Sequence, residues 1–219
     1  MGNTVRKMES THLPESKLEA RMVEALRRRV TDGPPIRTFN SILLKFPQID
    51  GSLRNCKATF DQFDEDSNGT IDLEELRKCC RHLDVSFTEE ETSDLFGACD
   101  INQDKGISFN EFIVILCLIY LLKDDPSVSY AKLRIGVPEL ETTFETLVNV
   151  FNFLDKNNDG YVSKADMALA IKESGEHFSG QIALKRFEEM DWDKNGAVSF
   201  KEFLFTFTRW VGIDDAEEE

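Results

Sequence analysis

Four short stretches of this 219-residue chain carry oxygen-bearing side chains at alternate positions and end in a carboxylate. They begin at Asp64, Asp100, Asp155 and Asp191 and read DEDSNGTIDLEE, DINQDKGISFNE, DKNNDGYVSKAD and DWDKNGAVSFKE. Twelve-residue loops of this kind surround a hard cation with oxygens from positions 1, 3, 5, 7, 9 and 12, the seventh through its backbone carbonyl. The chemistry that they predict is the binding of divalent metal ions, calcium above all.

We number these segments loops one to four, and each supplies a candidate ligand from every one of those six positions. In loops one and two the candidates are Asp64, Asp66, Asn68, Thr70, Asp72, Glu75, Asp100, Asn102, Asp104, Gly106, Ser108 and Glu111. In loops three and four they are Asp155, Asn157, Asp159, Tyr161, Ser163, Asp166, Asp191, Asp193, Asn195, Ala197, Ser199 and Glu202. The sequence predicts up to four bound calcium ions.

Two loops depart from the calcium pattern, whereas loops one and four follow it throughout. Loop two has Lys105 at its sixth position, where glycine is expected because the backbone turns through positive φ there. Loop three ends in Asp166, which is one methylene shorter than glutamate and reaches an ion less easily with both oxygens. This ending favours the smaller Mg²⁺ and weakens calcium binding. The alternative for any of the loops is a degenerate loop kept only for packing.

Helices must flank these loops, and the apolar residues on both sides recur at helical spacing. The loop starts form two close pairs with a longer gap between them, which predicts two lobes. Position 8 is aliphatic in every loop, so we expect Ile71 to pair with Ile107, and Val162 with Val198, as short strands. The predicted fold is all-α: four helix–loop–helix hands in two lobes, with a helical extension at the N-terminus.

The predicted boundaries follow from composition and loop spacing. Residues 1–50 form a basic extension, residues 51–123 the first lobe, residues 124–141 a linker, and residues 142–219 the second lobe with an acidic tail. Residues 15–30 have an apolar face at helical spacing and a cationic end, which predicts an amphipathic helix.

Two further helical segments are expected in the first lobe and before it. A short helix is predicted over Phe39–Phe46, ending near Pro47, and the helix entering loop one over Leu53–Phe63. Thr88-Glu89-Glu90-Glu91 is a capping-box pattern that opens the helix entering loop two.

Eleven consecutive apolar residues, Phe112–Leu122, form the helix after loop two. A membrane-spanning helix needs about 20 residues, so we expect a helix covered on several faces within the protein. The candidates for its cover are the Leu18–Val30 helix, the Phe39–Phe46 segment, the other lobe and a partner protein.

Because of these four loops, residues 52–211 resemble calmodulin and its relatives. The basic extension, the longer central gap and the scattered cysteines make the chain most similar to plant calmodulin-like proteins. This resemblance implies a cytosolic calcium sensor that opens an apolar groove and binds a helix of a target protein, whose identity the sequence does not give. The chain has only five methionines and 17 phenylalanines, which indicates a stiffer groove, with few targets or with the chain's own N-terminal helix as its occupant.

Charge and cysteine usage narrow the partners and the compartment. The formal net charge of −15 argues against nucleic acid. The basic N-terminus favours either weak association with anionic membranes or contact with its own acidic lobes. The cysteines are expected as buried thiols of a reducing compartment, so a cytoplasmic location is predicted, with the nucleus as a second compartment. Myristoylation of Gly2 would add membrane association. The chain matches that motif incompletely, because it has Arg6 where the motif has Ser or Thr.

Catalysis is not expected, because the three histidines lie in none of the common catalytic motifs. The leading prediction is a monomeric calcium sensor. The alternatives are a calcium buffer that stays closed and a calcineurin-B-like regulatory subunit of a single enzyme.

Overall fold

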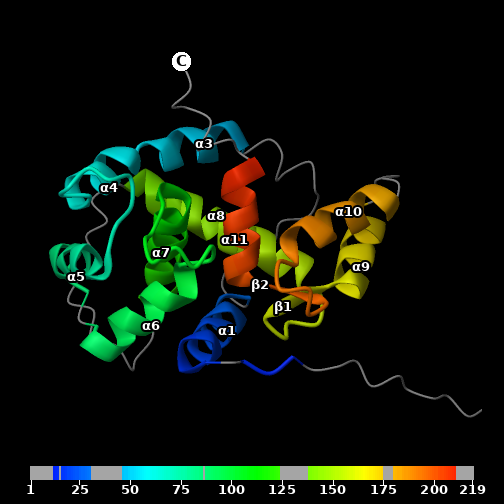
Figure 1. The fold of residues 1–219 in the computed structure, drawn as a ribbon. Coiled ribbons are helices and arrows are strands. Elements are labelled where there is room, and N and C mark those ends of the chain that lie inside the picture. Colours follow the sequence, from blue (N-terminus) through cyan, green and yellow to red (C-terminus); the bar gives the residue numbers. More distant parts are fainter. Residues whose placement is uncertain are drawn as a thin grey trace, which may run out of the picture.

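The computed structural model describes residues 12–14, 16–30, 46–85, 87–123, 138–174 and 180–210. Over these residues the chain is mostly helical, as predicted (Figure 1). The helices are α1 (Lys17–Arg29), α3 (Phe46–Arg54), α4 (Lys57–Phe63), α5 (Leu73–His82), α6 (Glu89–Cys99), α7 (Phe109–Leu122), α8 (Pro138–Leu154), α9 (Lys164–Ser174), α10 (Gly180–Met190) and α11 (Phe200–Trp210). Each calcium-type loop joins two of them: α4 to α5, α6 to α7, α8 to α9, and α10 to α11.

The loops pair within each lobe through their eighth positions, as predicted. In the second lobe β1 (Tyr161–Ser163) and β2 (Ala197–Ser199) form an antiparallel ladder with Val162 opposite Val198. In the first lobe the contact is a single bridge between Ile71 and Ile107, whose backbone groups exchange hydrogen bonds of 2.8 and 2.9 Å. These contacts fix the two loops of a lobe against each other.

Local sequence signals account for several helix starts. Ser16 caps α1 by accepting a hydrogen bond from the Glu19 amide at 3.0 Å. Thr88 and Glu91 form the predicted capping box of α6. In hand one the cap belongs to the loop itself, because Asp72 is the N-cap of α5 and Glu75 completes its capping box. Two candidate metal ligands therefore also start the helix that leaves the loop.

Prolines lie at helix starts where the sequence predicted interruptions. Pro47 is the second residue of α3. Likewise α8 begins at Pro138, inside the segment predicted as a linker. Residues 39–45 of the helix predicted over Phe39–Phe46 lie outside the described part of the chain, so that helix and its end near Pro47 stay a prediction. Proline is tolerated in the first helical turn, because the amide that it lacks has no partner within the helix there. The predicted Leu53–Phe63 helix is divided between α3 and α4.

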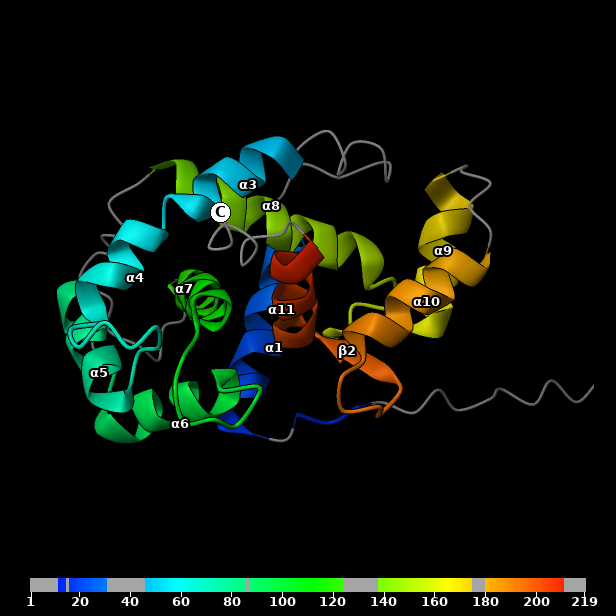
Figure 2. The same cartoon turned by 45° about the horizontal axis from the view of Figure 1, so that its top comes forward.

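Helix α7 forms the centre of the molecule. Every residue from Phe112 to Leu122 is at most 4% exposed, which confirms that this apolar run is covered on all faces. The cover comes from α1, α4 and α6 and from α8 and α11 of the second lobe. Figure 2 shows α7 nearly end-on, surrounded by these helices. Among the predicted candidates, the N-terminal helix and the other lobe thus both contribute.

The described part of the chain contains no helix that is both long and apolar enough to cross a membrane. The 14-residue α7 is instead an internal helix. Most phenylalanines that flank the loops lie in the same core: Phe60, Phe112, Phe151 and Phe187 are fully buried, while Phe96 is partly buried.

All the cysteines of the chain are free thiols and buried, as predicted: Cys56, Cys79, Cys80, Cys99 and Cys117. Burial raises the pKa of the Cys56, Cys80 and Cys99 thiols to about 12. Burial raises the pKa of Cys79 and of Cys117 as well. Because the thiolate is the form that reacts and binds metals, these residues serve the core rather than a redox or zinc site.

Candidate metal centres

The first carboxylate is held by two backbone amides of the same loop in loops one to three, and by the amide of Gly196 in loop four. The Asp64 oxygens accept hydrogen bonds from the amides of Asn68 and Gly69 at 3.0 and 2.9 Å. The same pattern recurs for Asp100 and for Asp155, with distances of 2.8 to 3.2 Å. These bonds fold the loop around its first ligand, so the local sequence alone can build the site.

The carboxylate at position 12 closes each loop by joining its two ends. Glu75 accepts from the amides of Glu65 and Asp72, both at 2.8 Å. Glu111 and Glu202 make the equivalent bonds in loops two and four. Asp166 also spans both ends of loop three, accepting from Lys156 at 3.2 Å and from Ser163 at 2.9 Å. The shorter side chain therefore reaches the same two amides, although at a longer distance on the Lys156 side.

Two positions of every loop have a left-handed backbone. Position 6 has φ of 85°, 90° and 89° at Gly69, Gly160 and Gly196, and 69° at Lys105. The predicted strain at Lys105 is thus present, since a non-glycine residue in this region costs about 1–2 kcal/mol. Position 4 is left-handed in all the loops as well, at Ser67, Gln103, Asn158 and Lys194. This feature is not visible in the sequence, because these residue types carry no common signal.

Carboxylates converge most closely in loops one and four. Oxygens of Asp64, Asp66 and Glu75 lie within 4.8 Å of one another, and so do oxygens of Asp191, Asp193 and Glu202. Like charges at this separation repel, and a divalent cation relieves that repulsion.

The donor set of these loops fits calcium rather than a softer metal. All the converging ligands are carboxylate oxygens, which hard cations prefer. In loop four Oδ1 of Asp191 is buried and accepts no hydrogen bond from the described residues. A buried acceptor without a hydrogen bond is costly. Position 1 of such a loop supplies an oxygen ligand to Ca²⁺, so a bound ion would be the missing partner of this oxygen. Calcium would be held in loop four by Asp191, Asp193 and Glu202 with the remaining oxygens of the loop.

Burial also acts on the protonation of two ligands. The pKa of Asp155 is raised to about 6, mainly by burial. The carboxylates of Asp159 and Asp166 also contribute to the rise, while hydrogen bonds from the backbone amides of Gly160 and Asp159 oppose it. Burial likewise raises the pKa of Glu202. Both effects come from carboxylates gathered away from water, which is the electrostatic setting of a cation site.

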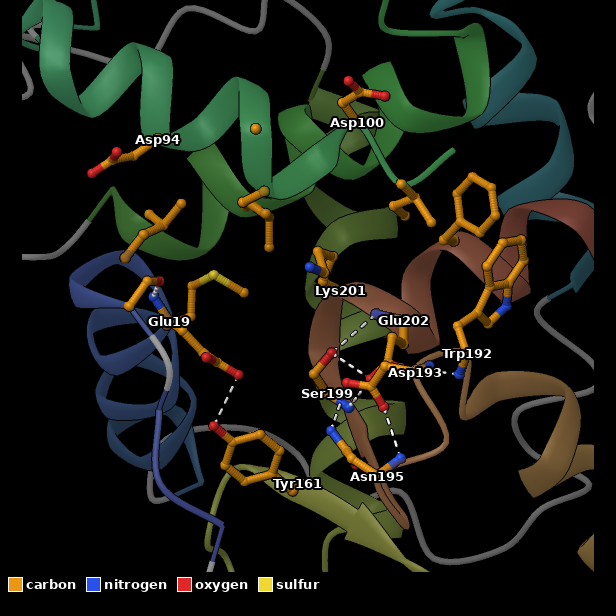
Figure 3. A pocket seen from close by; sticks show the side chains of 18 of the residues that line it. Glu19, Asp94, Asp100, Tyr161, Trp192, Asp193, Asn195, Ser199, Lys201 and Glu202 are labelled. Atoms are coloured by element: carbon orange, nitrogen blue, oxygen red, sulfur yellow. Dashed lines mark hydrogen bonds between the residues drawn. The ribbon is translucent and has the colours of Figure 1, made fainter. Parts of the chain in front are cut away.

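A cavity of about 610 Å³ lies between the lobes and beside three of the loops. Its walls come mainly from α1, α6, loop two, loop four and α11, with Tyr161 of loop three (Figure 3). Glu19 and Tyr161 lie on one side of it, and Lys201 lies between Asp100 of loop two and Glu202 of loop four in the view. The loops of both lobes therefore border one shared space.

The N-terminal helix contacts loop three directly, a contact that the sequence does not predict. Arg27 donates hydrogen bonds to the backbone carbonyls of Asn158 and Asp159, both at 3.1 Å. The Tyr161 hydroxyl donates to Glu19 at 2.9 Å. The tyrosine at position 7 and the arginine-rich end of the helix were visible in the sequence, but nothing there paired them.

Paired helix–loop–helix units that gather carboxylates in twelve-residue loops define an EF-hand protein. A family model for the EF-hand domain pair matches residues 54–116 and 144–208. The chain therefore belongs to the EF-hand family, as a calcium-binding protein of the calmodulin-like type.

The relatives agree with this assignment. The probable calcium-binding protein CML21 of Arabidopsis thaliana is 63% identical over 220 residues, covering 99% of this chain and 95% of that protein. The probable calcium-binding protein CML22 of the same plant is 43% identical, covering 94% and 91%. Calcium-dependent protein kinase 13 of Arabidopsis thaliana is 26% identical over 161 residues, which cover 72% of this chain but only 27% of the kinase. The relatives matched over nearly their whole length are thus calcium-binding proteins.

Proposed function

We propose that this protein is a calcium sensor that changes conformation when calcium binds and then holds a helix of a target protein in an apolar groove. The observation that carries the proposal is the position of α7. This helix leaves loop two directly and is wholly apolar from Phe112 to Leu122. In sensors of this class, ion binding changes the angle between the helices of a hand. Any such change at hand two moves an apolar helix and exposes surface that another apolar helix can cover.

The covering of α7 in this structure favours a sensor over a buffer. A buffer has no use for a large apolar surface that is covered by separable elements. Here α1 and the second lobe provide much of the cover. The groove is therefore occupied from within the chain, and a target helix replaces part of that cover.

The proposal includes up to four calcium ions, with loop three also accepting magnesium because of Asp166. We place the protein in the cytoplasm as a non-catalytic monomer, with the nucleus as a second compartment and weak membrane association through its N-terminus. The net charge of −15 makes nucleic acid an unsuitable partner.

The test is a calcium titration of the full chain with two readouts, the fluorescence of an apolar dye and the binding of an amphipathic target helix. Magnesium at the same ionic strength is the matched control. Calcium alone should increase both signals. If calcium binds and neither signal changes, the protein is a buffer. If a target helix binds equally well with calcium and with a chelator, the protein is a constitutive regulatory subunit.

A further inference from the structure

The N-terminal helix α1 lies against loop three at the turn that shapes the ion site. Arg27 Nε and one terminal nitrogen donate to the carbonyls of Asn158 and Asp159, the fourth and fifth residues of the loop. In loops of this kind the fourth residue is not a ligand and the fifth binds through its side chain. Both carbonyls are therefore available to accept from a helix outside the loop.

The contact falls where the loop backbone is least relaxed. Asn158 has a φ of 55° and Gly160 a φ of 90°, so two of three consecutive residues are left-handed. A fork of two hydrogen bonds to the adjacent carbonyls opposes the relaxation of this turn. Arg27 thus favours the backbone conformation that the ion site needs.

Two further residues of α1 hold the same turn. A Cβ on Gly160 would lie 2.7 Å from Val23 Cγ1, so α1 and the loop approach to a distance that only glycine allows. The side chain of Tyr161 is buried, and its hydroxyl donates to Glu19 at 2.9 Å. Tyr161 occupies position 7, whose backbone carbonyl is a calcium ligand. One residue therefore connects the ion to α1.

The loop that receives this support is the one with the shorter closing carboxylate. Asp166 reaches the Lys156 amide at 3.2 Å, whereas Glu75 reaches the equivalent amide in loop one at 2.8 Å. A loop with a weaker closure gains more from external support of its turn, because less of its conformation is fixed from within.

We propose that α1 is part of metal site three: Arg27, Val23 and Glu19 are positioning residues that hold loop three in its ion-binding conformation. The proposal rests on the calcium binding proposed above and adds a coupling between loop three and the N-terminal helix. Because α1 docks on loop three in its ion-binding conformation, docking and ion binding favour each other. The charge of Arg27 opposes the ion, but its side chain is exposed and solvent screens this repulsion.

The coupling runs in both directions. An ion in loop three strengthens the hold of α1, and α1 also covers α7. The occupancy of loop three therefore controls how firmly α1 stays on its side of α7, so the apolar surface that the proposed function uncovers comes from movement at hand two and not from release of α1.

The test follows the position-6 amides of the full chain by NMR during a magnesium-free calcium titration. Gly160 donates to Asp155 at 2.8 Å, Gly69 to Asp64 at 2.9 Å and Gly196 to Asp191 at 3.2 Å, so one sample reports three loops separately. Arg27→Ala should raise the calcium midpoint at Gly160 on the order of tenfold. The midpoint at Gly69 should not move.

The matched control is Arg28→Ala, which removes the same charge from a neighbouring arginine that bonds Glu24 on α1 itself. It should leave the Gly160 midpoint within about twofold of the parent. Arg27→Lys keeps the charge and loses the planar fork, so it should also raise the calcium midpoint at Gly160. This variant decides the matter if the alanine variant does not fold.

Three results overturn the proposal: an unchanged Gly160 midpoint in both Arg27 variants, a shift to lower calcium, or an equal shift at Gly69. A parent protein whose Gly160 amide never responds also overturns it, while responses at Gly69 and Gly196 would leave the proposed function standing. The reverse coupling is read by trypsin cleavage within α1 in the presence of calcium. Asp155→Asn should speed this cleavage several-fold and Asp64→Asn should not; equal rates in the two variants refute the coupling.

Discussion

At the scale of single residues, the position-12 carboxylate has two roles: it closes the loop and caps the next helix, and it is a candidate metal ligand. Glu75 joins the two ends of loop one and completes the capping box of α5. The same oxygens are candidate ligands beside Asp64 and Asp66. Because an ion and two amides share one carboxylate, ion binding and the start of the leaving helix are linked at this residue.

We expect Glu75→Gln and Glu202→Gln each to remove one calcium equivalent from the full chain. An amide has a single oxygen and no charge, so it cannot bind an ion with two oxygens. Isothermal titration calorimetry gives the stoichiometry directly. The control is Glu74→Gln, which changes an exposed neighbour of Glu75 that bonds Arg77. An unchanged number of ions in either test variant would remove that carboxylate from the site.

Lys105 provides a second residue-scale prediction. Its φ of 69° is strained for a residue with a Cβ. Lys105→Gly should therefore stabilise the closed form of loop two by about 1 kcal/mol. The calcium midpoint of this loop would fall accordingly. Lys105→Ala removes the same amine and keeps the strain, so it should bring no gain; a gain as large as that of the glycine variant would show that charge, not backbone strain, limits the loop.

At the scale of elements, α1 belongs to the core rather than to a solvated tail. Its buried face consists of Leu18, Met22, Val23, Ala25 and Leu26. Its charged residues hold both lobes: Arg21 pairs with Glu91 on α6 at 3.1 Å, and Arg29 pairs with Glu145 on α8 at 2.8 Å. The basic extension therefore contacts acidic groups of its own chain.

Leu26→Ala tests the contribution of α1 to stability. Leu26 is 1% exposed, and emptying such a site costs about 2–5 kcal/mol through lost burial and a cavity. Urea denaturation followed by circular dichroism measures the change. Leu184→Ala makes the same substitution on α10 at a side chain that is 45% exposed, and it should cost less than about 0.5–1 kcal/mol. Equal effects of the two variants would mean that α1 adds nothing to the core.

At the scale of the whole molecule, the two lobes share one core. Helix α11 of the second lobe packs against α7 of the first, and α3 packs against α8. The main cluster of buried apolar residues has members from both lobes, from Leu18 to Phe207, and a small separate cluster joins Val23, Tyr161 and Ala197. Changes at either pair of loops therefore act on contacts that both lobes share.

Deleting residues 1–30 should uncover one side of α7. We expect a several-fold rise in apolar dye fluorescence, or aggregation, because fully buried leucines and isoleucines of α7 lose their cover. Deleting residues 1–11 removes only residues that precede the described part of the chain, and it serves as the control. A longer truncation that stays soluble and binds no more dye than the shorter one would show that α1 is not the cover.

The sequence by itself determined the loops, their candidate ligands and the helical class, and the aliphatic eighth positions predicted the strand pairing. The loops are local features: each folds around bonds between residues at most ten positions apart, such as Glu65 to Glu75. The sequence also established that Phe112–Leu122 must be covered, because eleven apolar residues leave no polar face.

Only the tertiary structure decided what provides that cover and what else the N-terminal helix contacts. Arg27 and Asn158 are 131 residues apart, and an amphipathic pattern shows which face of a helix is buried but not against what. Closing a chain of that length carries an entropic cost that many weak contacts offset together. No single residue type signals such a set of contacts, so the link between α1 and loop three is visible only in the folded chain.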